Sequence, residues 1–182
     1  MSKCILFLFL FLVSVVEAQE FKKTTESEIR GLAKDHLELF QYYLSELTND
    51  KHCSYERKAI RTKCLKLFSS DAEIETMALN KHKDRFHVSN YLLRVSEPPV
   101  DVDIDISFAQ DPVITKVEEI SYNKYEVFGN LIQIFEKTKN NSTYSDITVK
   151  SAIVVIEDLI IEGQSKRIIK ITRINAEKIF RT

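Results

Sequence analysis

The chain has 182 residues, of which 29% are charged, and its formal net charge is −1 at pH 7. A chain so close to neutral lacks the excess of lysine and arginine that electrostatic binding to nucleic acid requires, so no nucleic-acid partner is expected. The length suits one domain, which can form a hydrophobic core without a disulfide framework.

The first 18 residues predict a secretory signal peptide. Lys3 supplies an early positive charge, the run from Cys4 to Val16 is almost wholly apolar, and Ala18 ends the segment with the small residue that signal peptidase recognises. The apolar run of about 13 residues is shorter than the roughly 20 needed to span a bilayer. We therefore expect cleavage between Ala18 and Gln19 and one domain over residues 19–182. We expect that domain to be exported, either periplasmic or secreted, and not to span a membrane.

The first half of the remaining chain predicts three helices. Thr25 and Glu28 fit a capping box at the start of the first helix, and apolar residues follow at helical spacing. Pro98 and Pro99 prevent continuation of the last helix. The expected helices cover about residues 25–48, 54–68 and 86–95, with a short strand at residues 73–79.

The second half predicts strands. From Val100 to Phe108 apolar residues alternate strictly with polar ones, and turn residues such as Asp111-Pro112 separate the segments that follow. Because short turns join neighbouring strands, we expect an antiparallel meander, and helices followed by strands give an α+β fold. The expected strands cover residues 100–108, 113–121, 125–137, 144–161 and 165–180.

One strand segment is apolar on both faces. Between Ser151 and Ile156 both alternating sets of side chains are apolar, whereas an antiparallel strand with one wet face should alternate. The second face therefore needs a cover, either a helix of the same chain or another subunit. We predict a homodimer packed sheet to sheet.

The two cysteines beyond the signal segment are not expected to pair. Cys53 and Cys64 would be about 16 Å apart if both lay on one helix, and a disulfide needs Cα atoms within about 7 Å. Cys53 could pair only from a loop that folds back. Cys64 lies on the apolar stripe of its helix, which predicts an inert buried thiol.

Three segments carry a resemblance to a known family: Arg57–Phe68, Val88–Val95 and Tyr144–Lys150. With their order along the chain, the sequence resembles the nuclear transport factor 2-like family, and more narrowly its small exported members in Gram-negative bacteria. The resemblance implies a cone in which a strongly bent antiparallel sheet wraps the first helix and leaves a pocket at the wide end. Members of the family use that pocket either as enzymes or as binding and dimerisation modules, so the fold does not choose the function.

His36 is the one titratable side chain on the apolar stripe of the first helix. Histidine titrates near neutral pH and can act as a base, for which Asp146 or Glu126 could supply the orienting carboxylate. The alternative is a core histidine that bonds a backbone carbonyl. Aromatic residues could line the same pocket or simply fill the core. The pocket-lining candidates are His36, Tyr43, Tyr91, Tyr125 and Phe135.

No other chemistry-bearing motif is present. His82 and His87 do not have the spacing of a helical zinc pair, and the sequence contains no glycine-rich phosphate loop. We expect no metal, no cofactor and no catalytic residue. The sequence thus predicts an exported, non-catalytic domain that binds a small apolar ligand or a protein partner. The alternative is a pocket enzyme of the isomerase, dehydratase or cyclase type with His36 as base.

Overall fold

In a computed structural model, residues 24–78, 80–162 and 164–181 are described, and they form three helices and one seven-stranded sheet. The predicted signal segment, with its cleavage site at Ala18 and Gln19, lies outside these residues. Among the described residues, no helix is both long enough and apolar enough to cross a membrane.

The first helix, α1 (Glu26–Thr48), begins and ends where its sequence predicts. The Thr25 side chain caps it by accepting a hydrogen bond from the Glu28 amide at 3.2 Å. One stripe of the helix is buried because apolar residues recur every three or four positions. That stripe is formed by Ile29, Ala33, Leu37, Phe40, Leu44 and Leu47.

The other two helices are shorter than expected. Helix α2 (Ser54–Leu65) stops before Phe68, which already belongs to a strand, and α3 (Val88–Ser96) starts after Phe86, which belongs to another. Both cysteines are free, as predicted: Cys53 is exposed and Cys64 is buried. Burial raises the pKa of the Cys64 thiol to about 12, so this thiol is inert at neutral pH.

Seven strands form one sheet in the order β2-β1-β7-β6-β5-β3, and β4 pairs with the remaining half of β5. The five strands expected after residue 100 are all present. The strands are β1 (Phe68–Met77), β2 (Lys83–His87), β3 (Val102–Phe108), β4 (Val113–Ser121), β5 (Lys124–Lys139), β6 (Ser142–Ile161) and β7 (Gln164–Arg181).

The sheet differs from a simple antiparallel meander in two ways. Strand β1 pairs with β7 in parallel, so the sheet is mixed. Strands β3 and β4 are joined by a short turn but pair with opposite halves of β5. The long β5 offers one edge that is shared by two shorter strands, which local turn signals alone do not reveal.

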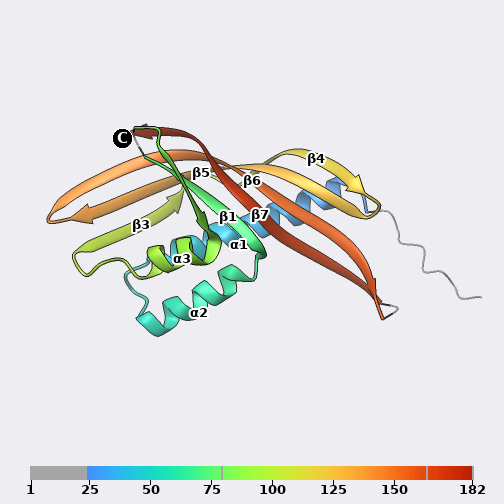
Figure 1. The fold of residues 1–182 in the computed structure, drawn as a ribbon, viewed down its shortest axis with the longest axis horizontal. Helices are drawn as coiled ribbons and strands as arrows, with labels where there is room; N and C mark the ends of the chain where they lie inside the picture. The colour runs from blue at the N-terminus through green and yellow to red at the C-terminus, as the bar shows by residue number, and fades with distance from the viewer. Residues whose placement is uncertain (1–23, 79, 163, 182) are drawn as a thin grey trace, which may run out of the picture.

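The helices and the sheet form an α+β arch. Figure 1 shows the long strands β5 and β6 curving over the helices, with α1 running along the length of the sheet. At the point where α1 crosses β5, Gly129 faces the helix, and a Cβ atom there would lie 2.8 Å from Leu37 Cδ1. Its cross-strand neighbour is Ala152. These small side chains let the helix lie close to the sheet.

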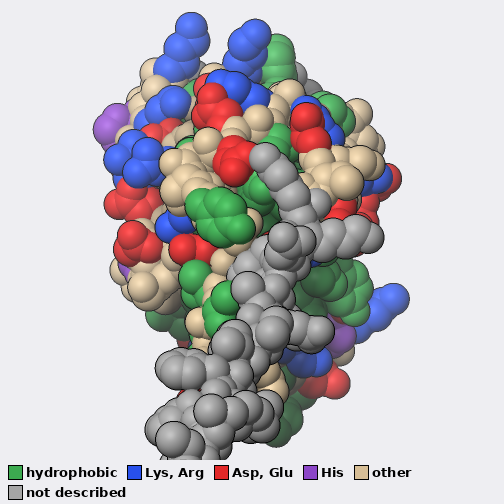
Figure 2. All heavy atoms as spheres, turned by 90° about the vertical axis from the view of Figure 1, so that its right-hand side faces the viewer, with side chains coloured by type: hydrophobic (Ala, Val, Ile, Leu, Met, Phe, Trp, Pro, Cys, Tyr) green, Lys and Arg blue, Asp and Glu red, His purple; other side chains and the backbone are tan. Residues whose placement is uncertain are grey.

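Charges of both signs cover the end of the molecule that carries β4. Figure 2 shows acidic and basic side chains interspersed there with apolar ones rather than gathered by sign. The exposed apolar side chains of β4, the β4–β5 turn and the end of β6 are Val113, Ile120, Tyr122, Ile160 and Ile161.

Candidate functional site

A cavity of about 340 Å³ lies between α3 and the inner face of the sheet. Strands β1, β2, β3, β5 and β6 and helix α3 supply its lining. The lining is mostly apolar but includes several polar groups. It is formed by Thr76, Met77, Asp84, Phe86, Tyr91, Arg94, Val95, Ile104, Gln133, Phe135, Asp146, Thr148 and Lys150.

The polar part of this lining comes mainly from the first half of β6. Asp146, Thr148 and Lys150 point to the same side as the apolar residues that follow them in phase along the strand, and they are 6%, 6% and 3% exposed. The Thr148 hydroxyl donates a hydrogen bond to Asp146 Oδ1 at 3.0 Å. The inner face of β6 therefore changes from polar to apolar along its length, and the cavity lies over the polar half.

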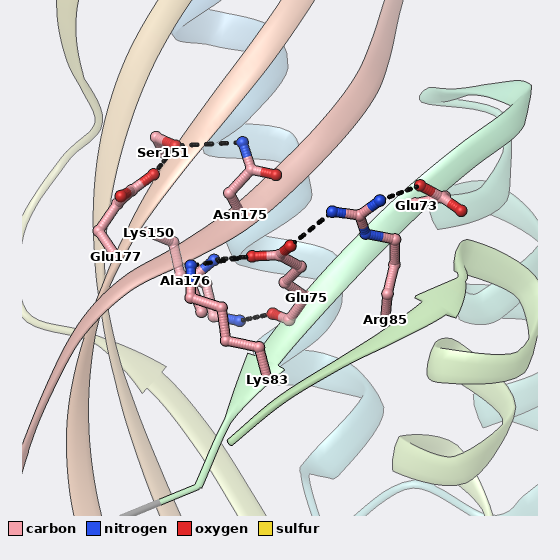
Figure 3. A network of polar contacts seen from close by, with 9 residues as sticks. All are labelled: Glu73, Glu75, Lys83, Arg85, Lys150, Ser151, Asn175, Ala176 and Glu177. Carbon is pink, nitrogen blue, oxygen red and sulfur yellow. Dashed lines mark hydrogen bonds and ion pairs between the residues drawn. The ribbon is translucent and has the colours of Figure 1, made fainter. Parts of the chain in front are cut away.

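Lys150 carries the most deeply buried charge of the site. Its Nζ donates a hydrogen bond to the backbone carbonyl of Glu75 at 2.9 Å (Figure 3). The last register pair of the parallel β1–β7 ladder joins Ile74 to Ile174, so Glu75 lies where the ladder ends. The lysine thus supplies a hydrogen-bond donor to this backbone carbonyl at the end of the ladder.

The Glu75 side chain is engaged elsewhere. Its carboxylate lies 2.8 Å from the Arg85 guanidinium and 3.2 Å from Lys83 Nζ, both on β2, and it also accepts from the Ala176 amide at 3.4 Å (Figure 3). The hydrogen bond from Arg85 is the main reason that the pKa of Glu75 is lowered. This carboxylate therefore forms ion pairs with the two basic residues of β2, and it makes no direct ion pair with Lys150.

Burial without a contacting carboxylate changes the acidity of Lys150. Removal from water disfavours the charged form, so the pKa of Lys150 falls to about 8, although the negative charges of Asp146 and Glu75 act in the opposite direction. Near neutral pH the amine exists in both protonation states. Such a group can donate to an acceptor or, when neutral, act as a base or nucleophile.

Tyr91 adds a hydroxyl donor to the same cavity. It is 6% exposed, and burial raises its pKa to about 12, so the hydroxyl keeps its proton across the physiological range. The side chain of Gln133, which is 5% exposed, lines the same cavity and lowers the pKa of this tyrosine against the larger effect of burial. The two residues add neutral hydrogen-bonding groups beside the charged ones.

A wider, more open hollow of about 740 Å³ adjoins the cavity. The two share Met77, Phe135 and Asp146, and the outer hollow extends along the end of the β5–β6 hairpin. A small molecule therefore has a route to the buried amine from the hairpin end of the sheet.

Two of the predicted pocket residues line this cavity, and three do not. Tyr91 and Phe135 belong to its walls. Tyr125 is buried in the main core, and Tyr43 packs beside Tyr42 with ring centroids 5.4 Å apart. Helical and strand periodicity places aromatics on the inner face, but it does not distinguish the filled end of the arch from the open end.

His36 lies away from the cavity. It is half-buried on α1, and its Nε2 is 3.0 Å from the backbone carbonyl of Leu67. Burial is the main reason that its pKa is lowered. It does not line the cavity that contains Asp146, one of the two carboxylates considered as its partner in the enzyme alternative. The geometry matches the alternative of a histidine that bonds a backbone carbonyl.

Lys150, Thr148 and Gln133 were missed as site residues, and Asp146 was considered only as a partner of His36, although the sequence contains a signal for them. On both β5 and β6 a polar side chain continues the phase of the buried apolar set. Polar residues that continue the alternation of the core-facing side chains along a strand predict one of two things. Either that end of the strand is exposed to solvent, or these residues line a cavity. Within the described part of the chain, no group of three or more His, Cys, Asp or Glu side chains could hold a metal ion.

No protein-family model and no curated protein sequence matches this chain. It is similar in fold to several solved structures. One is a scytalone dehydratase-like protein from Novosphingobium aromaticivorans, 14% identical, covering 86% of this chain and 88% of that chain with a TM-score of 0.49.

The second is a nuclear transport factor 2-like protein of unknown function from Shewanella baltica, 9% identical, covering 87% of this chain and 99% of that chain with a TM-score of 0.43. The third, from Salmonella enterica, is described as a nuclear transport factor 2-like superfamily protein and is 10% identical, covering 84% of this chain and 92% of that chain with a TM-score of 0.46. The solved structures similar to this chain include nuclear transport factor 2-like proteins.

Proposed function

We propose that this protein binds a small, neutral and mainly apolar molecule in the cavity beside α3. The observation that carries the proposal is the combination of an apolar wall with buried donors at one end. About 340 Å³ is within the range of small-molecule sites, which start at roughly 300 Å³. Phe86, Val95 and Ile104 offer apolar surface, while Lys150 and Tyr91 offer donors.

The charges of the lining favour a neutral ligand. Two acidic residues, Asp84 and Asp146, and two basic ones, Arg94 and Lys150, line the cavity, so their formal charges cancel. Asp84 and Arg94 are exposed at the rim and have partners there, His82 at 3.2 Å and the Phe86 ring at 4.5 Å. A hydrogen-bond acceptor on the ligand would meet the buried lysine.

The proposal is for binding rather than turnover. The choice is supported by the position of His36, the base considered in the enzyme alternative, which bonds a backbone carbonyl and does not line this cavity. We further propose that the protein acts after export. That part of the proposal is supported by the apolar segment from Cys4 to Val16, which ends at the small residue Ala18.

We also propose that the protein is a homodimer packed through the outer face of the sheet. Apolar pairs cross β5 and β6 on that face, with Ile132 opposite Val149, Ile134 opposite Ile147 and Phe128 opposite Ile153. All six side chains are only half-buried in the isolated chain. A second copy would cover them, because a two-fold interface brings the same patch of each subunit together.

The binding proposal is tested with three neutral aromatic probes: acetophenone, toluene and 4-methylphenol. Their binding is measured by saturation-transfer NMR and by the shift in the thermal unfolding temperature. Ile104→Trp should fill the cavity and weaken binding about tenfold or more, which corresponds to about 1.4 kcal/mol. Ile114→Trp is the matched control, because Ile114 is also half-buried on a strand that pairs with β5 but does not line the cavity.

Binding of at least one probe that is lost in Ile104→Trp and kept in Ile114→Trp supports the proposal. Equal loss in both variants, or no probe bound by the unmodified protein, would overturn it. Circular dichroism of both variants checks that each is folded.

A further inference from the structure

The Lys150 amine is placed as a nucleophile facing a cavity rather than as half of an ion pair. It is 3% exposed and lines the cavity, and its Nζ donates a hydrogen bond to the Glu75 carbonyl at 2.9 Å. Among the described residues, no carboxylate makes an ion pair with it, since Glu75 is taken by Lys83 and Arg85. Because the carbonyl accepts one N–H in either protonation state, the lone pair of the neutral amine stays free.

We infer that Lys150 captures the carbonyl carbon of a small aldehyde or ketone as a reversible imine. The inference rests on the proposed function, because the carbonyl compound must first enter the cavity. It adds the chemical class of the ligand and the atom that holds it. The neutral lining suits a carbonyl compound, which brings an acceptor oxygen without a charge.

The step balances without any added redox partner. The nitrogen lone pair of the neutral amine attacks the carbonyl carbon and forms a C–N bond, while the C=O electron pair moves to oxygen, which takes the first amine proton. The C–O bond then breaks as the nitrogen lone pair forms the C=N bond, and the oxygen leaves as water with the second amine proton. Amine and carbonyl compound become imine and water, and hydrolysis reverses the reaction.

The groups around Lys150 favour this reaction. Its pKa of about 8 leaves roughly one amine in ten neutral near pH 7, far more than for an exposed lysine. The Tyr91 hydroxyl, which lines the same cavity and keeps its proton, can donate to the carbonyl oxygen. Thr148 holds Asp146 through a hydrogen bond of 3.0 Å, so a second oxygen-bearing group is fixed in the same wall.

Reductive trapping tests the inference. The full chain is treated with benzaldehyde and sodium cyanoborohydride, and the benzylated lysines are located and timed by peptide mapping. Lys83 is the internal control, because it is exposed yet contacts the same glutamate. We expect Lys150 to be labelled at least about tenfold faster than Lys83, because only Lys150 combines a lowered pKa with a binding cavity.

Further experiments distinguish imine formation at Lys150 in the cavity from the general reactivity of lysine side chains. Acetophenone in excess should slow labelling of Lys150 and not of Lys83, and Ile104→Trp should do the same by filling the cavity. In urea the two lysines should be labelled at similar rates, which also confirms that both peptides are detected. Lys150→Arg should lose the adduct at this position while the labelling rate of Lys83 stays unchanged.

The outcomes distinguish this inference from the function on which it rests. If acetophenone binds but Lys150 is labelled no faster than Lys83 in the folded protein, the imine is overturned and the binding proposal stands. If none of the neutral probes binds, the binding proposal falls and the inference falls with it.

Discussion

Lys150 is the residue on which the candidate site depends. It bonds the carbonyl of Glu75 where β1 leaves β7, and it faces the cavity from the centre of β6. A structural role and a ligand-binding role therefore meet in one side chain. Burying an ammonium without a contacting carboxylate is costly, and the lowered pKa records that cost.

Stability should depend on pH through Lys150. Its pKa is about 8 in the fold and 10.5 for the free side chain, so the penalty for the buried charge is full below pH 8 and is relieved as pH rises toward 10.5. Between about pH 7 and about pH 9.5 the free energy of unfolding of the unmodified protein should rise by about 2 kcal/mol relative to that of Lys150→Met. Urea unfolding at a series of pH values measures the difference.

The comparison isolates Lys150 from other groups that titrate at alkaline pH. Because the pKa of Tyr91 is raised, this residue lowers the stability of the fold at pH values above the usual pKa of tyrosine. Tyr91 is present in both proteins, so its effect cancels in the comparison. The charges acting on Lys150, Asp146 and Glu75, are also common to both. The free energy of unfolding of Lys83→Met should change with pH in the same way as that of the unmodified protein. A difference between the unmodified protein and Lys150→Met that does not change with pH would contradict the argument.

The two free cysteines should differ in reactivity. Cys53 is exposed at the start of α2, whereas Cys64 is fully buried and has a thiol pKa of about 12. In protein that begins at Gln19, Ellman's reagent should therefore modify one thiol before unfolding and two after it. Cys53→Ser should abolish the reaction of the folded protein. Rapid modification of two thiols in the native state would show that the α2 core opens readily.

At the scale of elements, the contact between α1 and β5 sets how closely the helix lies against the sheet. Gly129 and Ala152 are cross-strand neighbours beneath the helix, and Leu37 occupies the space above Gly129. Leu37 is fully buried, so it has no solvent into which it can move. A glycine is needed here for room rather than for backbone freedom.

Gly129→Ala should destabilise the protein by about 1–3 kcal/mol, because the added Cβ would lie 2.8 Å from Leu37 Cδ1 and 3.3 Å from Ile114 Cδ1. The measurement is urea unfolding at constant pH. Gly31→Ala is the matched control, since no atom lies within 4 Å of a Cβ added at this exposed helical position. It should stabilise the protein by about 0.5–1 kcal/mol. Equal effects of the two changes would refute the close-approach argument.

At the scale of the whole molecule, the two faces of the sheet differ in what covers them. The inner face packs on the helices and holds the core and the cavity, while the outer face of β5 and β6 carries half-buried apolar pairs. In the described part of the chain the helices cover the inner face. The proposed dimer accounts for the apolar character of the outer one.

Val149→Lys should convert the proposed dimer to a monomer. The substitution places a charge opposite Ile132 at the centre of the apolar pairs, and burying it between subunits without a partner would cost several kcal/mol. Light scattering coupled to size-exclusion chromatography gives the mass in solution. Val113→Lys, at an exposed position on β4, should leave the mass unchanged. A monomeric unmodified protein at micromolar concentration would rule out the dimer.

Much of the fold was predictable because its signals are local. The Thr25 cap, the periodic stripe of α1 and the period-two alternation after Val102 each depend on residues close together in the chain. Strand β2 was not predicted because only one of its five residues, Phe86, is apolar, so its sequence shows no apolar alternation. The parallel pairing of β1 with β7 joins segments about a hundred residues apart, and no local pattern records it.

By itself, the sequence determined the α+β class and the positions of α1 and the five later strands, because periodicity reports which side of an element is buried. Only the tertiary structure decided which face of β6 is the inner one and which part of that face encloses space. The polar half of β6 meets α3 and the end of β1, and there Lys150 is both buried and accessible from a cavity. The difference is physical: burial phase is a local property of the chain, whereas a cavity exists only where distant elements fail to fill the volume between them.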